Sequence, residues 1–222
     1  EAGIGRAVVH SVAISPERVQ HINDFIARSV AQHPDRFTGF ATLHPDMDDP
    51  AAELDRALSM GLKGVKMHSD MQRVALDDPR MEKIYAVCEG VCPLLLHAGD
   101  RRYHFDNPSQ IAAAAKRHPK LTFIAAHLGG MRRYDQVEKH LLGRKNVYLD
   151  TAMTAAYLHD EAQFVRVLRG HGLDRVLFAT DCPWSNPERE LHLLDNAGLS
   201  QQEYDAVTYG NALRLLSSNR PQ

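Results

Sequence analysis

The sequence has few of the residues that would indicate a secreted protein. Its 222 residues include only three cysteines and one tryptophan. Three cysteines are too few for a disulfide framework, and Cys88 and Cys92 have no second pair with which to form a zinc ribbon. Because this usage is typical of a reducing compartment, we expect a cytoplasmic protein.

Long apolar runs and an excess of basic charge are also missing. No apolar stretch approaches the roughly 18 residues that span a bilayer, so we expect no membrane partner. The formal net charge is -2, which leaves no basic excess to neutralise phosphates and argues against a nucleic-acid partner. A small-molecule substrate is the expected partner, and a homo-oligomer is compatible with the sequence.

Seven strand-like runs alternate with helix-like segments along the chain. The runs span residues 6–13, 37–43, 64–68, 93–97, 121–127, 147–150 and 176–181. The first of them is short and β-branched, which is typical of a strand buried on both faces. Helix starts follow the runs, with Asx-Pro or Ser-Pro pairs at residues 15–16, 49–50, 107–108 and 186–187. Strict alternation predicts an α/β fold with a parallel sheet, as a barrel or a doubly wound sheet.

No glycine-rich phosphate fingerprint follows an early strand, which disfavours a nucleotide-binding open sheet. Titratable residues instead gather at strand ends, where a parallel barrel places its catalytic groups. They are Lys66, His68, His97, His127, Asp150 and Asp181, with His10 and His44 close to their own strand ends. We therefore predict a (β/α) barrel, and period-2 alternation places Lys66 and His68 on one face, which we take to be the inner one.

His97, His127 and Asp181 end three separate apolar strands and form the candidate metal site. Taken singly, a strand-end histidine is more often a hydrogen-bonded core residue, and Asp181 could simply cap the next turn. Together they supply the imidazole and carboxylate ligands that suit zinc, manganese or iron. The sequence predicts one divalent metal ion at this site, with zinc as the first choice.

Seven segments in order carry a family resemblance over almost the whole chain. They are GFATLHPD (39–46), GLKGVKMHSDMQ (61–72), PLLLHAGD (93–100), FIAAHLGG (123–130), VYLDTA (147–152), VLFATDCPW (176–184) and NALRLL (211–216). With them the chain resembles the amidohydrolase-related branch of the TIM-barrel metal-dependent hydrolases, a group that includes aminocarboxymuconate-semialdehyde decarboxylase.

The resemblance implies a role for each strand-end ligand. His97 would be a metal ligand from the fifth barrel strand and Asp181 a ligand from the eighth. His127, on the sixth, would position or deprotonate the metal-bound water or serve as a further ligand. The family's other two ligands come from a His-x-His motif on the first strand, and this sequence contains no such motif.

By family order the run 6–13 looks like the second strand. We therefore expect residues 1–222 to form one barrel domain that is incomplete at its N-terminus, with an exposed edge between the first and last strands. Two explanations stay open: the chain is part of a longer enzyme, or the protein lacks half of its metal site.

The resulting functional hypothesis is a metal-dependent hydrolase acting on a small carboxylate-bearing molecule through an activated water, with His127 and Asp181 as catalytic residues. A non-oxidative decarboxylase of the same family is one alternative. A non-catalytic barrel with a decayed metal site is the other.

Four residues are candidates for substrate binding: Lys66, His68, Arg132 and Trp184. Arg132 belongs to a group of cations, with Arg101, Arg102 and Arg133, that follows His97 and His127 and favours an anionic substrate. Each has an ordinary structural alternative: a satisfied interior charge for Lys66, a solvated loop for the arginines and packing between helices for Trp184. Cys182, beside Asp181, is interpreted as a small buried filler.

Overall fold

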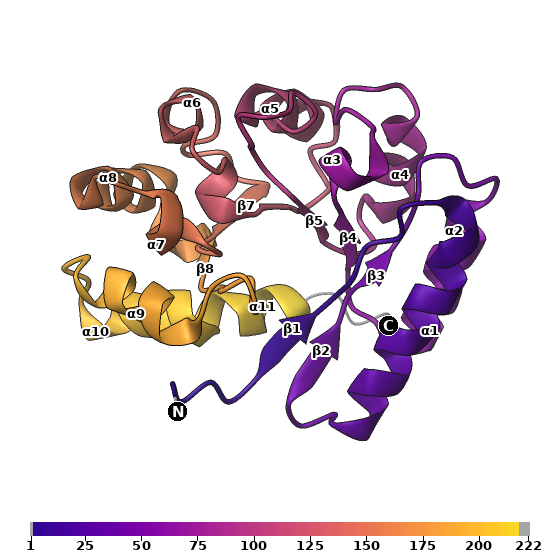
Figure 1. The fold of residues 1–222 in the computed structure, drawn as a ribbon, viewed down its shortest axis with the longest axis horizontal. Helices are drawn as coiled ribbons and strands as arrows, with labels where there is room; N and C mark the ends of the chain where they lie inside the picture. Colours follow the sequence, from indigo (N-terminus) through magenta and orange to yellow (C-terminus); the bar gives the residue numbers. More distant parts are fainter. Residues whose placement is uncertain (1, 218–222) are drawn as a thin grey trace.

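The computed structural model describes residues 2–217, with a curved wall of parallel strands inside and helices outside (Figure 1). The strands are β1 (Ala7–Val9), β2 (Phe37–Gly39), β3 (Ala41–Thr42), β4 (Val65–Met67), β5 (Leu94–Leu96), β6 (Phe123–Ala125), β7 (Val147–Asp150) and β8 (Val176–Leu177). β1 pairs with β2, and β3 to β8 form a second sheet in sequence order. All seven predicted runs are present, in a parallel arrangement.

The helices follow the strands in turn. They are η1 (Pro16–Arg18), α1 (Val19–Gln32), α2 (Pro50–Ser59), α3 (Ser69–Gln72), α4 (Met81–Cys88), α5 (Pro108–Arg117), η2 (His127–Gly129), α6 (Tyr134–His140), α7 (Thr154–Tyr157), α8 (Glu161–His171), η3 (Leu173–Arg175), α9 (Pro187–Asp195), α10 (Gln201–Asp205), η4 (Ala206–Gly210) and α11 (Asn211–Ser217). Two Asx-Pro starts work as predicted: the Asp49 side chain accepts from the Ala52 N–H, and the Asn186 side chain from the Arg189 N–H.

The predicted run 37–43 is divided at Phe40. Its N–H donates to the carbonyl of Val9 at 3.0 Å, while the N–H of Ala41 donates to the carbonyl of Gly64 at 2.8 Å. The same run therefore pairs with β1 through its first half and with β4 through its second. This division is why seven strand–helix units contain eight strands.

The ring of strands is open. Within residues 2–217 no ladder joins β8 to β1, in agreement with a TIM-type barrel whose first strand is missing. The expectation that the run 6–13 is buried on both faces is wrong: Ala7 and Val8 are exposed, Val8 by 39%. The reason is that β1 has a neighbour, β2, on one side only.

Side-chain alternation divides the core into two layers. Leu94 and Leu96 face the helices, whereas Leu95 belongs to the inner cluster. That inner cluster consists of Phe40, Leu95, Ile124, Ala126, Leu177 and Leu215. Leu215 comes from α11, so a helix shares in filling the interior that strands alone fill in a closed barrel.

No helix within residues 2–217 combines the length and apolarity that crossing a bilayer requires.

Candidate metal centre and active site

His97 and His127 follow β5 and β6 and meet at the carboxyl end of the sheet. His97 Nδ1 lies 2.9 Å from His127 Nε2, and both rings are buried. His127 Nδ1 lies 3.0 Å from the carbonyl oxygen of Ala152. A carbonyl can only accept, so His127 Nδ1 is the donor and, in the neutral ring, Nε2 carries a lone pair directed at His97. The 2.9 Å contact is then a hydrogen bond that His97 Nδ1–H donates to His127 Nε2, and a metal bound at this edge of His97 would replace that proton.

The backbone around these residues is held in unusual conformations. His127 has φ 58° and Asp181 has φ 60°, in the left-handed region that costs a side chain roughly 1–2 kcal/mol. Asp150 fixes the first of these turns, because its Oδ1 accepts the N–H groups of His127 and Ala152, each at 3.0 Å. Strained positions of this kind concentrate at functional sites.

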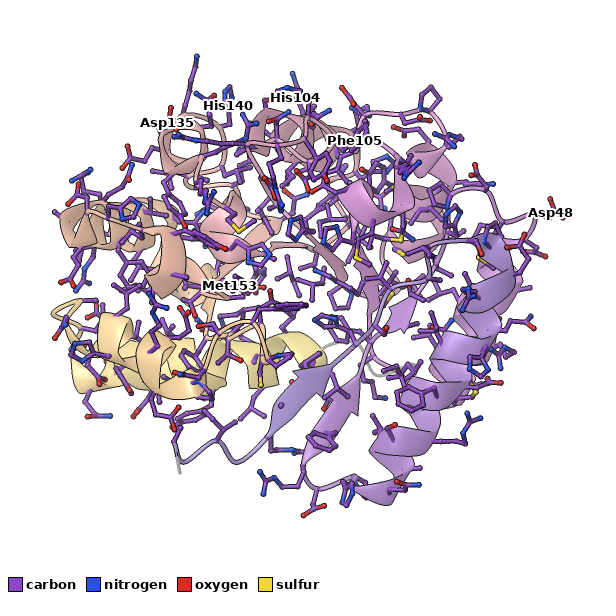
Figure 2. All side chains as sticks on the ribbon, in the orientation of Figure 1. Asp48, His104, Phe105, Asp135, His140 and Met153 are labelled. Atoms are coloured by element: carbon purple, nitrogen blue, oxygen red, sulfur yellow. The ribbon has the colours of Figure 1, made fainter. Side chains whose placement is uncertain are left out.

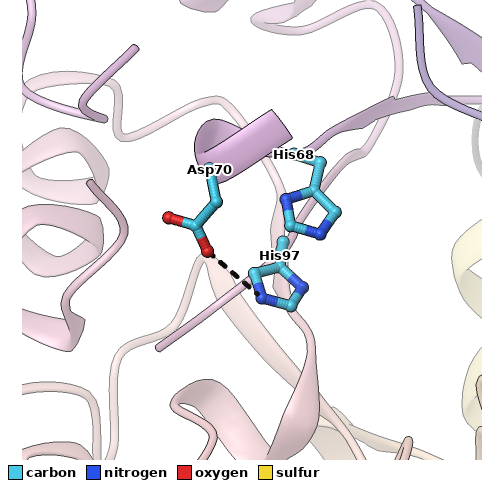
Figure 3. Close-up of side chains that lie close together, drawn as sticks. All are labelled: His68, Asp70 and His97. Carbon is cyan, nitrogen blue, oxygen red and sulfur yellow. Dashed lines mark ion pairs between the residues drawn. The ribbon is translucent and has the colours of Figure 1, made fainter. Parts of the chain in front are cut away.

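The opposite edge of the His97 ring faces carboxylates. Its Nε2 lies 3.7 Å from Asp70 Oδ2 (Figure 3). Asp106 Oδ2 lies 3.9 Å from the same nitrogen. The His68 ring stacks on His97 with centroids 3.8 Å apart and planes at 11°. Among residues 2–217, His68, Asp70 and His97 form the one group of three metal-ligand side chains whose donor atoms lie within 4.8 Å of one another.

Stacking makes this group of three a poor set of ligands in its present form. An imidazole nitrogen binds a metal in the plane of its ring, so two parallel stacked rings cannot both point at one ion until one ring turns. The edge of His97 that faces His127 has no such conflict. That edge offers imidazole nitrogen, a donor type that divalent metals such as manganese and zinc accept. Near His97, three buried polar atoms lack a hydrogen-bond partner: His68 Nδ1, Asp70 Oδ1 and Asp106 Oδ2.

Burial keeps the histidines of this cluster neutral, which is the form that binds metal. It lowers the pKa of His10 and His68 to about 3, and positive neighbours such as Lys66 act in the same direction. The pKa values of His97 and His127 are lowered by the same cause.

Burial acts in the opposite direction on the nearby acids. It raises the pKa of Asp70 to about 6, with a contribution from the charge of Asp100. It raises the pKa of Asp106 to about 8, with contributions from Asp70 and Asp100. The cluster thus combines neutral imidazoles with carboxyl groups that ionise reluctantly.

A pocket of about 360 Å³ opens beside the His68–His97 stack. Its lining residues are His68, Asp70, Met71, Arg73, His97, Asp100, Arg102, Tyr103 and Met131. Arg102 is paired with Asp100 through an Nη2–Oδ2 contact of 2.6 Å. Arg73 and Arg102 thus both line a pocket that reaches His68 and His97.

A family model described as amidohydrolase matches residues 2–217. The chain belongs to the amidohydrolase family. Gamma-resorcylate decarboxylase of Polaromonas sp. is 27% identical over 256 residues, covering 92% of this chain and 77% of that protein. The 2-amino-3-carboxymuconate-6-semialdehyde decarboxylase of Dictyostelium discoideum is 36% identical over 237 residues, covering 89% of this chain and 66% of that protein. The chain thus spans just under two thirds of this second relative.

Solved structures support the amidohydrolase barrel. An uncharacterized TIM-barrel protein from Bordetella bronchiseptica has a TM-score of 0.82 at 22% identity, over 98% of this chain and 79% of that one. A dihydroxybenzoic acid decarboxylase from Polaromonas sp., with bound manganese and the inhibitor 2-nitroresorcinol, has a TM-score of 0.66 at 20% identity, over 99% of this chain and 80% of that one. At these identities the likeness shows the fold.

The amidohydrolase barrel brings some predicted site residues together and separates others. His97 and His127 are in direct contact, and Lys66 is buried, with burial lowering its pKa against the opposing charges of Asp150, Asp181 and Asp106. Asp181 acts electrostatically on His127 and Lys66 but lies outside the group of His68, Asp70 and His97. Its role as a ligand stays a prediction.

Three predicted residues in the loops after the strands, Trp184, Cys182 and Arg132, lie elsewhere than the sequence indicated. Trp184 is 77% exposed and does not line the 360 Å³ pocket, so the alternative of packing between helices is wrong, and its role in substrate binding stays a prediction. Cys182 is exposed, and the interpretation as a buried filler is wrong, because the strand ends at Leu177 and the chain has left the core. Arg132 stacks on Tyr157 at 4.2 Å and, with Arg101 and Arg133, lines a separate hollow of about 210 Å³.

Sequence reasoning missed the two carboxylates at His97. Asp70 carries a weak signal, since it follows His68 by two residues in the first turn of α3. Asp106 carries none, because it lies in a loop whose path brings its carboxyl group to the Nε2 edge of the ring.

Proposed function

We propose that the chain is the catalytic barrel of a metal-dependent decarboxylase that acts on a small carboxylate-bearing molecule. The observation that carries the proposal is the buried contact of His97 Nδ1 with His127 Nε2 at the mouth of an amidohydrolase barrel. Both relatives described above are decarboxylases by name, which favours this chemistry over the hydrolysis that the sequence first indicated.

We assign His97 and Asp181 as metal ligands. Two side chains do not complete the coordination of a divalent metal, so further ligands are needed. A divalent ion there would polarise substrate oxygen atoms as a Lewis acid. Manganese becomes the first choice over zinc, because solved decarboxylases of the same fold carry it. The two guanidinium groups of Arg73 and Arg102 at the pocket would attract the substrate carboxylate.

His127 takes the proton-transfer role in this proposal. Decarboxylation breaks a carbon–carbon bond, releases carbon dioxide and leaves an electron pair on carbon that must take up one proton. Because Nδ1 of His127 is already held by the Ala152 carbonyl, Nε2 can gain and lose a proton without breaking that bond. Asp150 supports the charged ring, since its carboxylate acts to raise the His127 pKa against burial.

The test is an assay of the manganese-loaded protein with gamma-resorcylate and 2-amino-3-carboxymuconate-6-semialdehyde, with carbon dioxide measured against substrate consumed. We expect equal amounts. His127→Ala should lower kcat by about 100-fold or more while metal content stays unchanged. The control is His21→Ala, an exposed histidine on α1, which should leave kcat unchanged.

Other outcomes would overturn the proposal in distinguishable ways. Turnover of a lactone or ester without carbon dioxide release would restore the hydrolase hypothesis. A protein that binds no metal and turns over neither class would favour the decayed scaffold. Full activity in His127→Ala would remove this residue from the mechanism.

A further inference from the structure

The two edges of the His97 ring face different chemical groups. The Nδ1 edge faces His127, and the Nε2 edge faces the carboxylates of Asp70 and Asp106. A neutral imidazole carries one proton, and whichever nitrogen carries it cannot bind a metal. At the Nδ1 edge His127 Nε2 accepts the proton of His97, so only an acceptor at the Nε2 edge can hold that proton instead and free the Nδ1 lone pair.

Asp106 is placed to make that decision. It is 1% exposed, and within residues 2–217 its Oδ2 has no hydrogen-bond partner. The distance of 3.9 Å to His97 Nε2 is longer than a hydrogen bond, and a ring movement of about 1 Å would close it. A buried carboxyl oxygen without a partner is costly, and a hydrogen bond from His97 Nε2–H would stabilise the ionised form that burial disfavours.

The backbone ties Asp106 to the segment that carries His97. The carbonyl of Asp106 accepts the N–H of Gly99 at 2.9 Å, two residues beyond His97. Asp70, by contrast, lies in α3 and lines the open pocket. Of the two carboxylates, Asp106 is the more buried and the one fixed to the His97 loop.

We propose that Asp106 is a positioning residue whose carboxylate accepts a hydrogen bond from Nε2–H of His97 and thereby leaves the Nδ1 lone pair available to a divalent metal. The inference rests on the proposed function, because it assumes that His97 is a ligand. Carboxylates that receive the second N–H of a metal-bound histidine fix its tautomer and orientation in many metal sites.

The test compares manganese affinity in the wild-type protein, Asp106→Asn and Asp48→Asn. We expect the Kd for manganese to rise about 10- to 100-fold in Asp106→Asn. Asp48 is exposed and lies at the periphery, so Asp48→Asn should leave the Kd unchanged (Figure 2). The thermal midpoint of the metal-free Asp106→Asn protein should be equal to or higher than that of the wild type, because a neutral amide replaces a buried ionisable group whose charged form burial disfavours.

A weaker manganese affinity together with an undiminished thermal midpoint distinguishes a positioning residue from one that only stabilises the fold. A structural carboxylate would lower both the midpoint and the affinity when replaced, and that result would overturn the proposal. An unchanged Kd in Asp106→Asn would overturn it too, as would a loss confined to Asp70→Asn. If the wild-type protein binds no metal, the proposed function fails first, and the inference fails with it.

A second measurement uses the wild-type protein alone and does not depend on how the variant folds. Long-range ¹H–¹⁵N correlation spectra of the zinc-loaded, histidine-labelled protein report which nitrogen of each ring is protonated, and the spectrum of His97→Gln assigns the His97 signals. We expect a protonated Nε2 and a metal-shifted Nδ1. Coordination through Nε2 would contradict the proposal.

Discussion

His171 shows at the scale of one residue how burial makes this protein sensitive to acid. Its ring, 1% exposed at the end of α8, lies with Nε2 2.9 Å from the carbonyl of Val147, so a neutral ring donates there. Burial lowers its pKa from 6.5 to about 4. Below pH 6.5 the unfolded chain takes up a proton that the folded chain refuses until about pH 4, so stability is lost as the pH falls through this window.

The free energy of unfolding should fall by roughly 3 kcal/mol between pH 6.5 and 4, because the His171 pKa differs between the unfolded and folded chain over that range. The measurement is the free energy of unfolding by urea at several pH values, for the wild type and for His171→Gln. Glutamine can donate to the Val147 carbonyl but does not titrate, so the variant should show a flatter dependence on pH. Parallel curves for the two proteins would show that His171 does not contribute.

Which single residues could be predicted depended on their distance from a strand. His97 and His127 follow strands directly, so the pattern that predicts the strand also predicts that the two side chains converge. Asp106 and Trp184 lie in loops, where the direction of a side chain depends on φ and ψ angles and on contacts that periodicity does not encode. The carboxylates at His97 and the exposure of Trp184 therefore required the structure.

At the scale of elements, the loops after β5 and β6 touch through a glycine. Gly99 has φ +70°, and a Cβ there would lie 2.7 Å from the backbone carbon of Gly130 and from the Met131 nitrogen. The adjacent Ala98 carbonyl accepts the N–H of Met131 at 2.8 Å. This close approach holds the segments that carry His97 and His127 together.

Gly99→Ala should therefore separate the two histidines as well as strain the backbone. We expect a loss of stability larger than the roughly 1–2 kcal/mol of a left-handed alanine, and a fall in kcat of about tenfold or more. Gly90→Ala is the matched control: Gly90 has φ +73° with nothing within 4 Å of its Cβ position. Thermal unfolding and turnover measure both effects, and equal losses in the two variants would contradict a special role for Gly99.

The sequence predicts the start of a helix well, because neighbouring residues determine it. It predicts the bounds and burial of a strand less well, because these depend on which other strands pair with it. The pairs Asp49-Pro50 and Asn186-Pro187 predict helix starts because cap and proline act within one turn. The division at Phe40 depends on which neighbouring strand each half of the run meets, and the exposure of β1 depends on a neighbour that it lacks on one side. Neither dependence is visible in the residues of the run itself.

At the scale of the whole molecule, an open ring gives a bound metal a structural role. The predicted ligands His97 and Asp181 follow β5 and β8, two strands that are not neighbours in the sheet, so an ion held by both would link distant parts of the wall. A ligand that binds only the folded state at 100 times its Kd adds about 2.7 kcal/mol of stability. For a domain of this size that corresponds to a rise of roughly 5–10 °C in the thermal midpoint.

Removing the metal should therefore lower the midpoint by that amount, and adding manganese back should restore it. The measurement is thermal unfolding of the manganese-loaded protein before and after dialysis against a chelator. Asp181→Asn should have a midpoint that responds little to the chelator, whereas Asp135→Asn, at an exposed position on α6, should respond like the wild type (Figure 2). Equal midpoints with and without chelator in the wild type would show that no ion links the strands, and a full response in Asp181→Asn would remove Asp181 from the ligand set.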